Sequence, residues 1–153
     1  MNTIELYAGV LLLNEKNQVY LIVEDDRNSI SKGRWNLPGG AVLYQEDLVT
    51  AAKRASREET GMEVEPVSLI GTYKCIKESK EWVYIVFSAH SSGMVHNEID
   101  AKVKKGKWFE KSEFIHLSAE ELVHPDMQLV YNIATEEKGA PIDTVKYIDY
   151  NLQ

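Results

Sequence analysis

Two adjacent carboxylates, Glu58 and Glu59, stand at the end of a segment with helical periodicity. On a helix at about 100° per residue, Glu59 projects from the middle of the apolar side and Glu58 from its edge. The apolar side is formed by Leu48, Ala51, Ala52 and Ala55. A core-facing carboxylate is costly unless it is paired or coordinated, and the negative end of the helix dipole disfavours it further. A divalent cation held between the two acids would relieve both penalties, and oxygen ligands favour Mg²⁺ or Mn²⁺ over zinc.

The alternative is an ordinary solvated helix end, since Arg54 stands one turn before Glu58 and can pair with it. The loop before the helix favours a functional site. Gly39 and Gly40 lack a Cβ and therefore allow unusual backbone angles and the close approach of a ligand. Glu46, near the helix start, is equally well explained by the helix dipole.

The sequence predicts a mixed sheet covered by helices, because strand-like runs precede and follow the helix without strict alternation. The helix is expected over residues 47–60, with Asp47 as N-cap and Gly61 as the residue that ends it. The other expected features are a hairpin around 14–17, a loop over 25–32, a strand pair around 78–80, a late strand within 104–114, a helical pattern over 118–139 interrupted at 124–125, and a short strand within 141–153.

Composition narrows the class of protein. The 153 residues suit one domain, and 44% hydrophobic residues suffice for a packed core. No apolar run reaches the length of a membrane span, and the first residues are expected to form a strand rather than a signal peptide. A formal net charge of -7 argues against a nucleic-acid partner. Cys75 is the only cysteine, which excludes an internal disulfide and favours a cytoplasmic location.

The pattern of acids, arginine and glycines resembles the box of the Nudix hydrolase family. That box reads Gly, five residues, Glu, seven residues, then Arg-Glu-aliphatic-any-Glu-Glu-any-Gly-aliphatic. The matching residues are Gly40, Glu46, Arg54, Glu58, Glu59, Gly61 and Met62. Ala55 replaces the first Glu after the arginine, which in the family is commonly a metal ligand and in some members the base, and Ser56 replaces the aliphatic residue. The resemblance implies a single α/β (α+β) domain over 1–153, built as an α-β-α sandwich with a mixed central sheet.

The resemblance also implies the metal-dependent hydrolysis of a nucleoside diphosphate linked to another moiety. Its cation, Mg²⁺ or Mn²⁺, is expected at Gly40, Glu46, Glu58 and Glu59, with Arg54 orienting a carboxylate. The expected substrate-binding residues are Trp35, Gly39, Gly40 and Tyr44, with Tyr73 and Trp82 as further aromatic platforms. The partner is a small-molecule nucleotide, and analogy with relatives that pair implies a homodimer.

Ala55 leaves two further functions open. If the base comes from elsewhere, Glu98 lies in a loop where several family members place an acid, and His124 precedes a proline in a break between helical stretches. His124 is similar in position to the histidine of GDP-mannose hydrolases of this family, so a nucleotide-sugar hydrolase is the second hypothesis. Glu120 and Glu121 are weaker base candidates, because their segment is typical of a first helical turn. The third hypothesis is a nucleotide-binding module without turnover.

Overall fold

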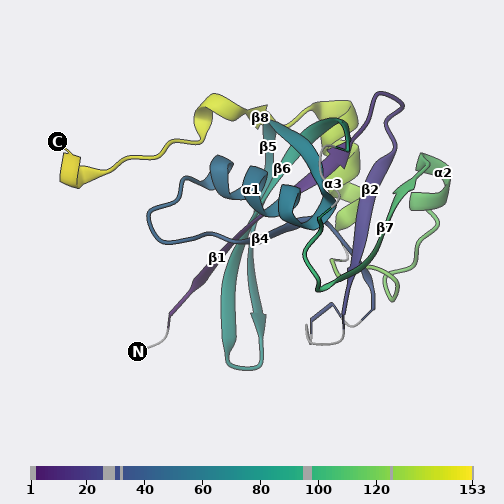
Figure 1. The fold of residues 1–153 in the computed structure, drawn as a ribbon, viewed down its shortest axis with the longest axis horizontal. Helices are drawn as coiled ribbons and strands as arrows, with labels where there is room; N and C mark the ends of the chain where they lie inside the picture. Colours follow the sequence, from purple (N-terminus) through teal and green to yellow (C-terminus); the bar gives the residue numbers. More distant parts are fainter. Residues whose placement is uncertain (1–2, 26–29, 32, 95–97, 125, 153) are drawn as a thin grey trace.

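The computed structural model describes residues 3–25, 30–31, 33–94, 98–124 and 126–152. Within these residues eight strands form one sheet with helices on both faces (Figure 1). The strands are β1 (Glu5–Leu13), β2 (Val19–Glu24), β3 (Trp35–Asn36), β4 (Gly39–Ala41), β5 (Met62–Lys77), β6 (Lys80–Met94), β7 (Val103–Phe109) and β8 (Ala140–Pro141). The α-helices are α1 (Leu48–Thr60), α2 (Lys111–Phe114) and α3 (Met127–Asn132).

The sheet is mixed, as predicted. Its strand order is β3-β2-β1-β6-β5-β8, with β4 paired to β1 and β7 paired to β2. Strands β1 and β6 run parallel, and the other pairs are antiparallel. The expected hairpin joins β1 to β2, and the expected strand pair is the long β5–β6 hairpin, which extends beyond the rest of the sheet (Figure 1).

Strand β1 separates two hydrophobic cores because its successive side chains face opposite sides of the sheet. Ala8, Val10 and Leu12 pack with Ala51 and Ala52 of α1. The core on the opposite face joins β1 and β2 to α2 and α3, and contains Leu11, Leu13, Val19, Leu21, Phe114, Met127, Val130 and Tyr131 among others. The helices therefore cover both faces, which confirms the predicted α-β-α sandwich.

The C-terminal third departs from the sequence prediction. Residues 118–122 form turns and a bridge from Leu122 to Trp35 instead of a helix, so Glu120 and Glu121 do not lie in a first helical turn. The break at His124 is present, and α3 starts only at Met127 before it continues as a π-helical turn, Ile133–Glu137. The expected tail strand is limited to β8, because short 3-10 turns at Ile142–Thr144 and Tyr150–Leu152 follow it.

Two further expectations concern the loop after β2 and membrane spans. Of the expected loop over 25–32, residues 26–29 and 32 lie outside the described residues. Among the helices of the described ranges, none combines the length and the apolar character needed to cross a membrane.

Candidate active site

Helix α1 begins and ends as the sequence predicts. The Asp47 side chain accepts a hydrogen bond from the Thr50 amide at 3.2 Å, and Gly61 ends the helix at φ 69° with its amide donating to the Arg57 carbonyl at 2.8 Å. The face turned to the sheet is buried and consists of Ala51, Ala52, Ala55, Ser56, Glu59 and Thr60. The alanines allow the helix to lie close to β1 and β4, and this close packing carries Glu59 into the protein.

Glu59 is an acid in the interior, with 2% of its side chain exposed. Its Oε1 accepts a hydrogen bond from the Gly39 amide at 2.7 Å. Among the described residues, no hydrogen-bond donor reaches Oε2, and the nearest cation is Lys102 Nζ at 3.7 Å. Burial, and then the neighbouring Glu24 carboxyl, raise the pKa of Glu59 to about 9, although the Gly39 amide and Lys102 act in the opposite direction. Glu59 therefore keeps its proton at neutral pH unless a cation joins it.

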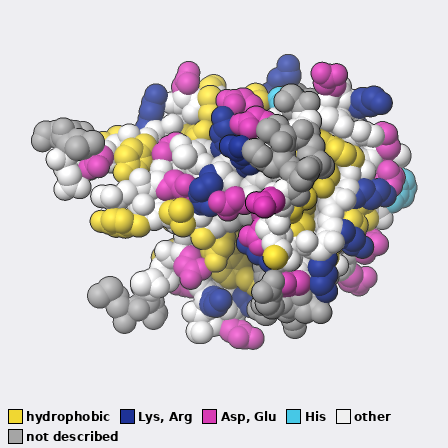
Figure 2. Space-filling model, viewed as in Figure 1, with side chains coloured by type: hydrophobic (Ala, Val, Ile, Leu, Met, Phe, Trp, Pro, Cys, Tyr) yellow, Lys and Arg dark blue, Asp and Glu magenta, His cyan; other side chains and the backbone are white. Residues whose placement is uncertain are grey.

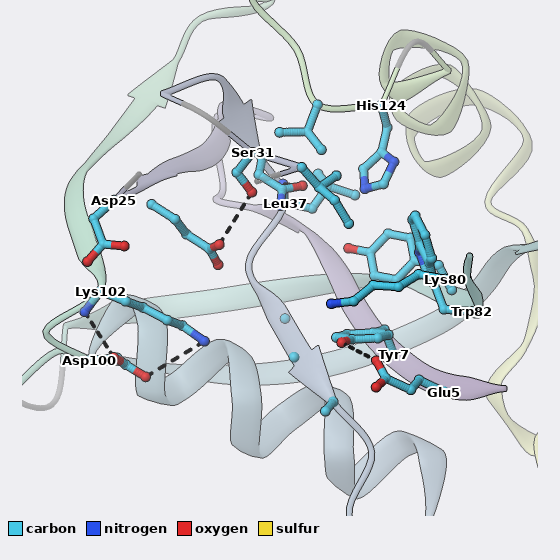
Figure 3. A pocket seen from close by; sticks show the side chains of 18 of the residues that line it. Glu5, Tyr7, Asp25, Ser31, Leu37, Lys80, Trp82, Asp100, Lys102 and His124 are labelled. Carbon is cyan, nitrogen blue, oxygen red and sulfur yellow. Dashed lines mark hydrogen bonds and ion pairs between the residues drawn. The ribbon is translucent and has the colours of Figure 1, made fainter. Parts of the chain in front are cut away.

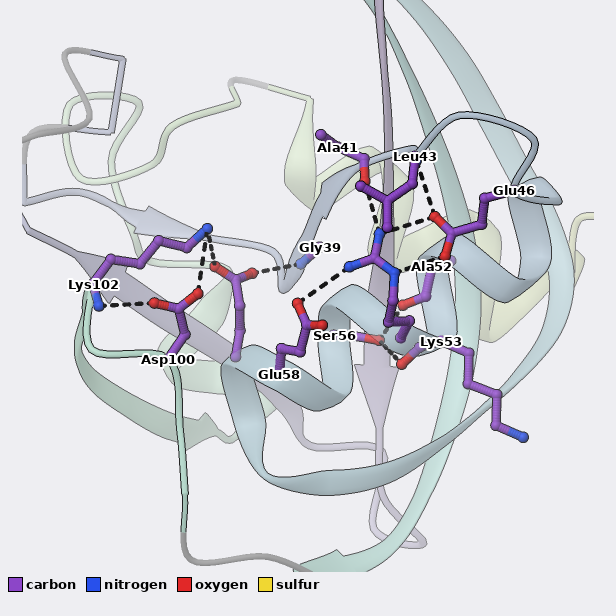
Figure 4. Close-up of polar contacts among 12 residues, drawn as sticks. Gly39, Ala41, Leu43, Glu46, Ala52, Lys53, Ser56, Glu58, Asp100 and Lys102 are labelled. Atoms are coloured by element: carbon purple, nitrogen blue, oxygen red, sulfur yellow. Dashed lines mark hydrogen bonds and ion pairs between the residues drawn. The ribbon is translucent and has the colours of Figure 1, made fainter.

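The residues around Glu59 come from the pairing of β2 with β7. Glu24, at the end of β2, is 6% exposed and accepts a hydrogen bond from the Ser31 hydroxyl at 3.3 Å. The next residue, Asp25, donates its amide to the Lys102 carbonyl at 2.8 Å, which joins the start of β7 to the end of β2. Lys102 Nζ lies between the carboxylates of Glu59 at 3.7 Å and Asp100 at 3.8 Å (Figure 4). A side-chain cation thus reaches into an acidic cluster.

Arg54 connects helix α1 to the loop before it through hydrogen bonds to Glu46 and Ala41, two residues labelled in Figure 4. Its Nε and Nη2 donate to the two carboxylate oxygens of Glu46 at 2.7 and 2.9 Å, and Nη2 also donates to the Ala41 carbonyl at 2.9 Å. The Leu43 amide donates to Glu46 at 3.0 Å. Arg54 is the largest cause that lowers the pKa of Glu46. Both carboxylate oxygens of Glu46 therefore accept hydrogen bonds that hold the loop to the helix, whereas the sequence predicted that Glu46 contacts the metal.

Glu58 departs from the expected inward direction. Its side chain is 54% exposed, and it accepts a hydrogen bond from Arg54 Nη1 at 3.2 Å. The predicted Arg54–Glu58 pair is thus present, and the two adjacent acids point different ways because Arg54 draws Glu58 to the helix surface. Acidic and basic side chains lie intermixed over the face that carries α1 (Figure 2).

A cavity of about 680 Å³ opens above this cluster. Glu24 lines this cavity. Asp25, Asp100 and Lys102 lie on one side of it, and Glu5, Tyr7, Lys80 and Trp82 lie on the other (Figure 3). Gly39 and Gly40 form part of the wall, as do Tyr84 and His124. The volume of the cavity suits a ligand of nucleotide size. One end of the cavity is lined by acidic side chains and the other carries the aromatic rings of Tyr7 and Trp82.

Gly39 and Gly40, which the sequence predicts to bind substrate, border the cavity, and a side chain would be excluded at Gly39 and crowded at Gly40. A Cβ on Gly39 would meet the Ala8 carbonyl oxygen at 2.5 Å, and a Cβ on Gly40 would lie 3.1 Å from the Ala55 Cβ. The glycines thus let β4 pack on β1 and α1 while the backbone borders the cavity.

The aromatic residues nearest the box in sequence lie elsewhere. The Trp35 ring packs edge-on against the Phe109 ring, with the two centroids 4.8 Å apart, and Lys105 Nζ lies 4.9 Å from the Trp35 centroid. Trp35 is not among the residues that line the large cavity. Tyr44 is 92% exposed in the loop before α1. Of the further platforms, Trp82 lines the large cavity, whereas Tyr73 lines a neighbouring cavity of about 240 Å³.

The two base candidates differ in position. His124 borders both cavities and stacks on Tyr84 with the ring centroids 4.9 Å apart. Burial, and then the positive charge of Arg34, lower the pKa of His124, so the imidazole is neutral at neutral pH. Glu98 is exposed and follows residues 95–97, which lie outside the described residues.

Several residues that line the cavity were not predicted from the sequence: Tyr7, Glu24, Asp25, Tyr84, Asp100 and Lys102. Glu24 carries a usable signal, because a carboxylate that closes an apolar strand is unusual. Asp100 and Lys102 carry none, since they reach the site only through the pairing of distant strands.

The donors around Glu59 Oε2 fit a hard divalent cation. The unsatisfied oxygen is buried, a second carboxyl lies beside it, and the set contains oxygen donors without sulfur. In the described part of the chain, no three histidine, cysteine or acidic side chains already converge as a metal site. A cation bound here would replace the Lys102 ammonium next to Glu59.

These observations define an α/β protein with a buried acid beside a cavity of nucleotide size. The model of the NUDIX domain matches residues 4–131, and the chain belongs to this family. The resemblance found in the box Gly40–Met62 is thereby confirmed. Hydrolysis of diphosphate linkages is the general reaction of the family.

The relatives and solved structures extend this result. The chain is 30% identical over 118 residues to the human protein named 8-oxo-dGDP phosphatase NUDT18, covering 74% of this chain and 35% of that protein. The Danio rerio protein of the same name is 26% identical over 119 residues, which cover 76% of this chain and 35% of that protein. The chain thus spans about a third of the length of these curated relatives.

The solved structures show the fold. A NUDIX hydrolase from Nitrosomonas europaea aligns with a TM-score of 0.82 at 19% identity, covering 97% of this chain and 99% of the other. The NUDIX domain of Shewanella oneidensis NrtR, solved with ADP ribose, aligns with a TM-score of 0.71 at 19% identity and 90% coverage of each chain.

Proposed function

We propose that this protein hydrolyses the diphosphate linkage of a small-molecule nucleoside diphosphate derivative with the help of Mg²⁺ or Mn²⁺. One observation carries the proposal. The buried Glu59 carboxyl has an oxygen without a hydrogen-bond donor among the described residues, next to the cavity wall. A natural chain keeps such a costly group where function requires it.

The cavity offers complementary ends for such a substrate. The phosphates would lie over Gly39 and Gly40, where Lys102 and the cation offset the acidic charge. The nucleobase or the second moiety of the substrate would lie towards Trp82 and Tyr7, whose rings suit stacking.

The residues divide the chemical tasks. When bound, a divalent cation stabilises the charge on the phosphate oxygens and helps to ionise water. Glu59 would hold the cation, and its bond from the Gly39 amide ties the carboxyl to the glycine loop. Arg54 keeps the loop and helix in register through Glu46 and Ala41. Lys102, with 42% of its side chain exposed, has room to turn from Glu59 to a phosphate.

The names of the relatives suggest which substrate to test first. The human and Danio rerio relatives are called 8-oxo-dGDP phosphatases, so an oxidised nucleoside diphosphate heads the list. A cavity of about 680 Å³ also accommodates larger diphosphates such as ADP-ribose or nucleotide sugars.

A nucleotide-sugar hydrolase with a histidine base is the second candidate. It is favoured by His124, which is neutral and borders the same cavity as Glu24 and Lys102. Hydrolysis in heavy-oxygen water separates the two reactions. The label enters phosphate when a diphosphate is cleaved, and it enters the sugar carbon when a sugar is released.

The decisive experiment is a panel of nucleoside diphosphate derivatives assayed with Mg²⁺ and with Mn²⁺ for the release of phosphate or sugar. Glu59→Gln removes the proposed ligand, and Glu15→Gln is the matched control because Glu15 is exposed in the β1–β2 turn. We expect metal-dependent turnover by the wild-type and Glu15→Gln proteins, and a loss of at least about 100-fold in Glu59→Gln. Tight nucleotide binding without turnover at any metal concentration would instead establish a binding module, which the lack of a carboxylate at Ala55 favours.

A further inference from the structure

The helix position that lacks a carboxylate lies directly below the glycine loop. Ala55 is buried, and its Cβ is 3.1 Å from the place that a Cβ on Gly40 would occupy. Gly40 lines the cavity of about 680 Å³, and Glu24, at the end of strand β2, lines the same cavity. We propose that Glu24 completes the cation site and provides the carboxylate that Ala55 lacks. This inference rests on the proposed function and assigns a ligand to it.

The backbone places Glu24 beside Glu59. Glu24 pairs with Val103 at the start of β7, directly after Lys102. Lys102 in turn reaches to 3.7 Å from Glu59 Oε2, the oxygen without a hydrogen-bond donor among the described residues. Gly39, whose amide donates to Glu59 Oε1 at 2.7 Å, lines the same cavity as Glu24. Two carboxyls from different elements therefore converge at one buried point.

Burial makes this convergence hard to explain as packing. Glu24 is 6% exposed at the end of an otherwise apolar strand, and Glu59 is 2% exposed. Two neighbouring buried carboxylates repel each other unless a proton or a cation lies between them. The Ser31 hydroxyl orients Glu24 Oε2 through a 3.3 Å hydrogen bond but adds no charge. A divalent cation would satisfy both acids at once.

The same geometry predicts that a carboxylate introduced at position 55 restores the cation binding lost when Glu24 is replaced. Ala55 lies against Gly40, whose backbone lines the cavity, so a longer side chain at position 55 would extend from α1 towards the site. Position 55 also lies one helical turn before Glu59, on the same buried face. A glutamate introduced by Ala55→Glu would therefore deliver a carboxylate to the site from α1 instead of from β2.

The test measures Mn²⁺ binding alone, without nucleotide, from the loss of the free-ion signal in electron paramagnetic resonance. We expect Glu24→Gln to weaken Mn²⁺ binding by at least about tenfold. Glu15→Gln, an equal loss of charge in the exposed turn of the same hairpin, should leave binding unchanged. The double variant Glu24→Gln/Ala55→Glu should recover at least half of the lost binding free energy.

Each outcome bears on one claim. If the wild-type protein binds no Mn²⁺, the proposed function fails. If it binds Mn²⁺ and Glu24→Gln binds it equally well, the role of Glu24 is overturned while the metal site at Glu59 stands. Should Glu24→Gln fail to fold by circular dichroism, Glu24→Asp takes its place. Its shorter side chain should weaken binding several-fold, and undiminished affinity would overturn the role.

Discussion

Glu59→Gln should make the metal-free protein more stable while it removes the metal site. Glutamine has the same shape, keeps an oxygen for the Gly39 amide and carries no ionisable group. In the wild type, burial and then the Glu24 carboxyl raise the pKa of Glu59 from 4.5 to about 9. The cost of this buried acid therefore depends on pH, and the substitution abolishes that dependence.

The sign and the size follow from proton linkage. Above pH 4.5 the unfolded chain loses this proton, whereas the folded chain holds it until about pH 9, so stability falls as pH rises through this window. The limiting slope is about 1.4 kcal/mol per pH unit, which gives about 4 kcal/mol between about pH 5 and pH 8. Relaxation and water entry reduce such costs, and we expect Glu59→Gln to gain about 2 kcal/mol at pH 8 and almost nothing at pH 5.

The assay is thermal and urea unfolding of metal-free protein at several pH values. For a chain of 153 residues, a gain of about 2 kcal/mol raises Tm by about 4–8 °C. Glu58→Gln is the matched control, because it changes the adjacent acid, whose side chain is 54% exposed. Equal pH dependence in the wild-type and Glu59→Gln proteins would refute the assignment of Glu59 as a buried, protonated acid.

Three further substitutions test the surroundings of the site. Arg54→Lys loses the paired hydrogen bonds to Glu46, so the free energy of unfolding should fall by about 2 kcal/mol in urea titrations, and an unchanged value would contradict the role of Arg54. Trp82→Ala should raise KM by about tenfold with little change in kcat, because the Trp82 ring lines the cavity. Tyr44→Ala, at an exposed site, should leave both constants unchanged. The opposite pattern would show that the nucleobase does not stack on Trp82. Lys102→Met should tighten Mn²⁺ binding without nucleotide but weaken nucleotide binding, because the ammonium lies 3.7 Å from Glu59 Oε2, and weaker Mn²⁺ binding would argue against competition.

Local periodicity was enough to predict helix α1 and the burial of Glu59. The cap at Asp47, the αL residue Gly61 and the apolar face all act within one element, so the sequence contains the information. The same periodicity did not fix the direction of Glu58, because this residue lies at the edge of the apolar face, where the ion pair with Arg54 holds its side chain at the surface.

Residues brought together by distant strands were not predictable in this way. Glu24 and Lys102 meet because β2 pairs with β7, and no short-range pattern specifies that register. For the same reason, closeness to the box in sequence did not place Trp35 in the cavity. Its strand β3 pairs with β2, and its ring packs against Phe109.

The most direct measurement of the central claim is the number of protons released when Mn²⁺ binds. Calorimetric titrations near neutral pH, in buffers of different ionisation enthalpy, provide this number. Because the pKa of Glu59 is about 9 before the metal binds, the wild type should release about one proton per bound Mn²⁺. Binding to the wild type with no proton release, or equally tight binding by Glu59→Gln, would show that the cation does not meet a buried, protonated Glu59.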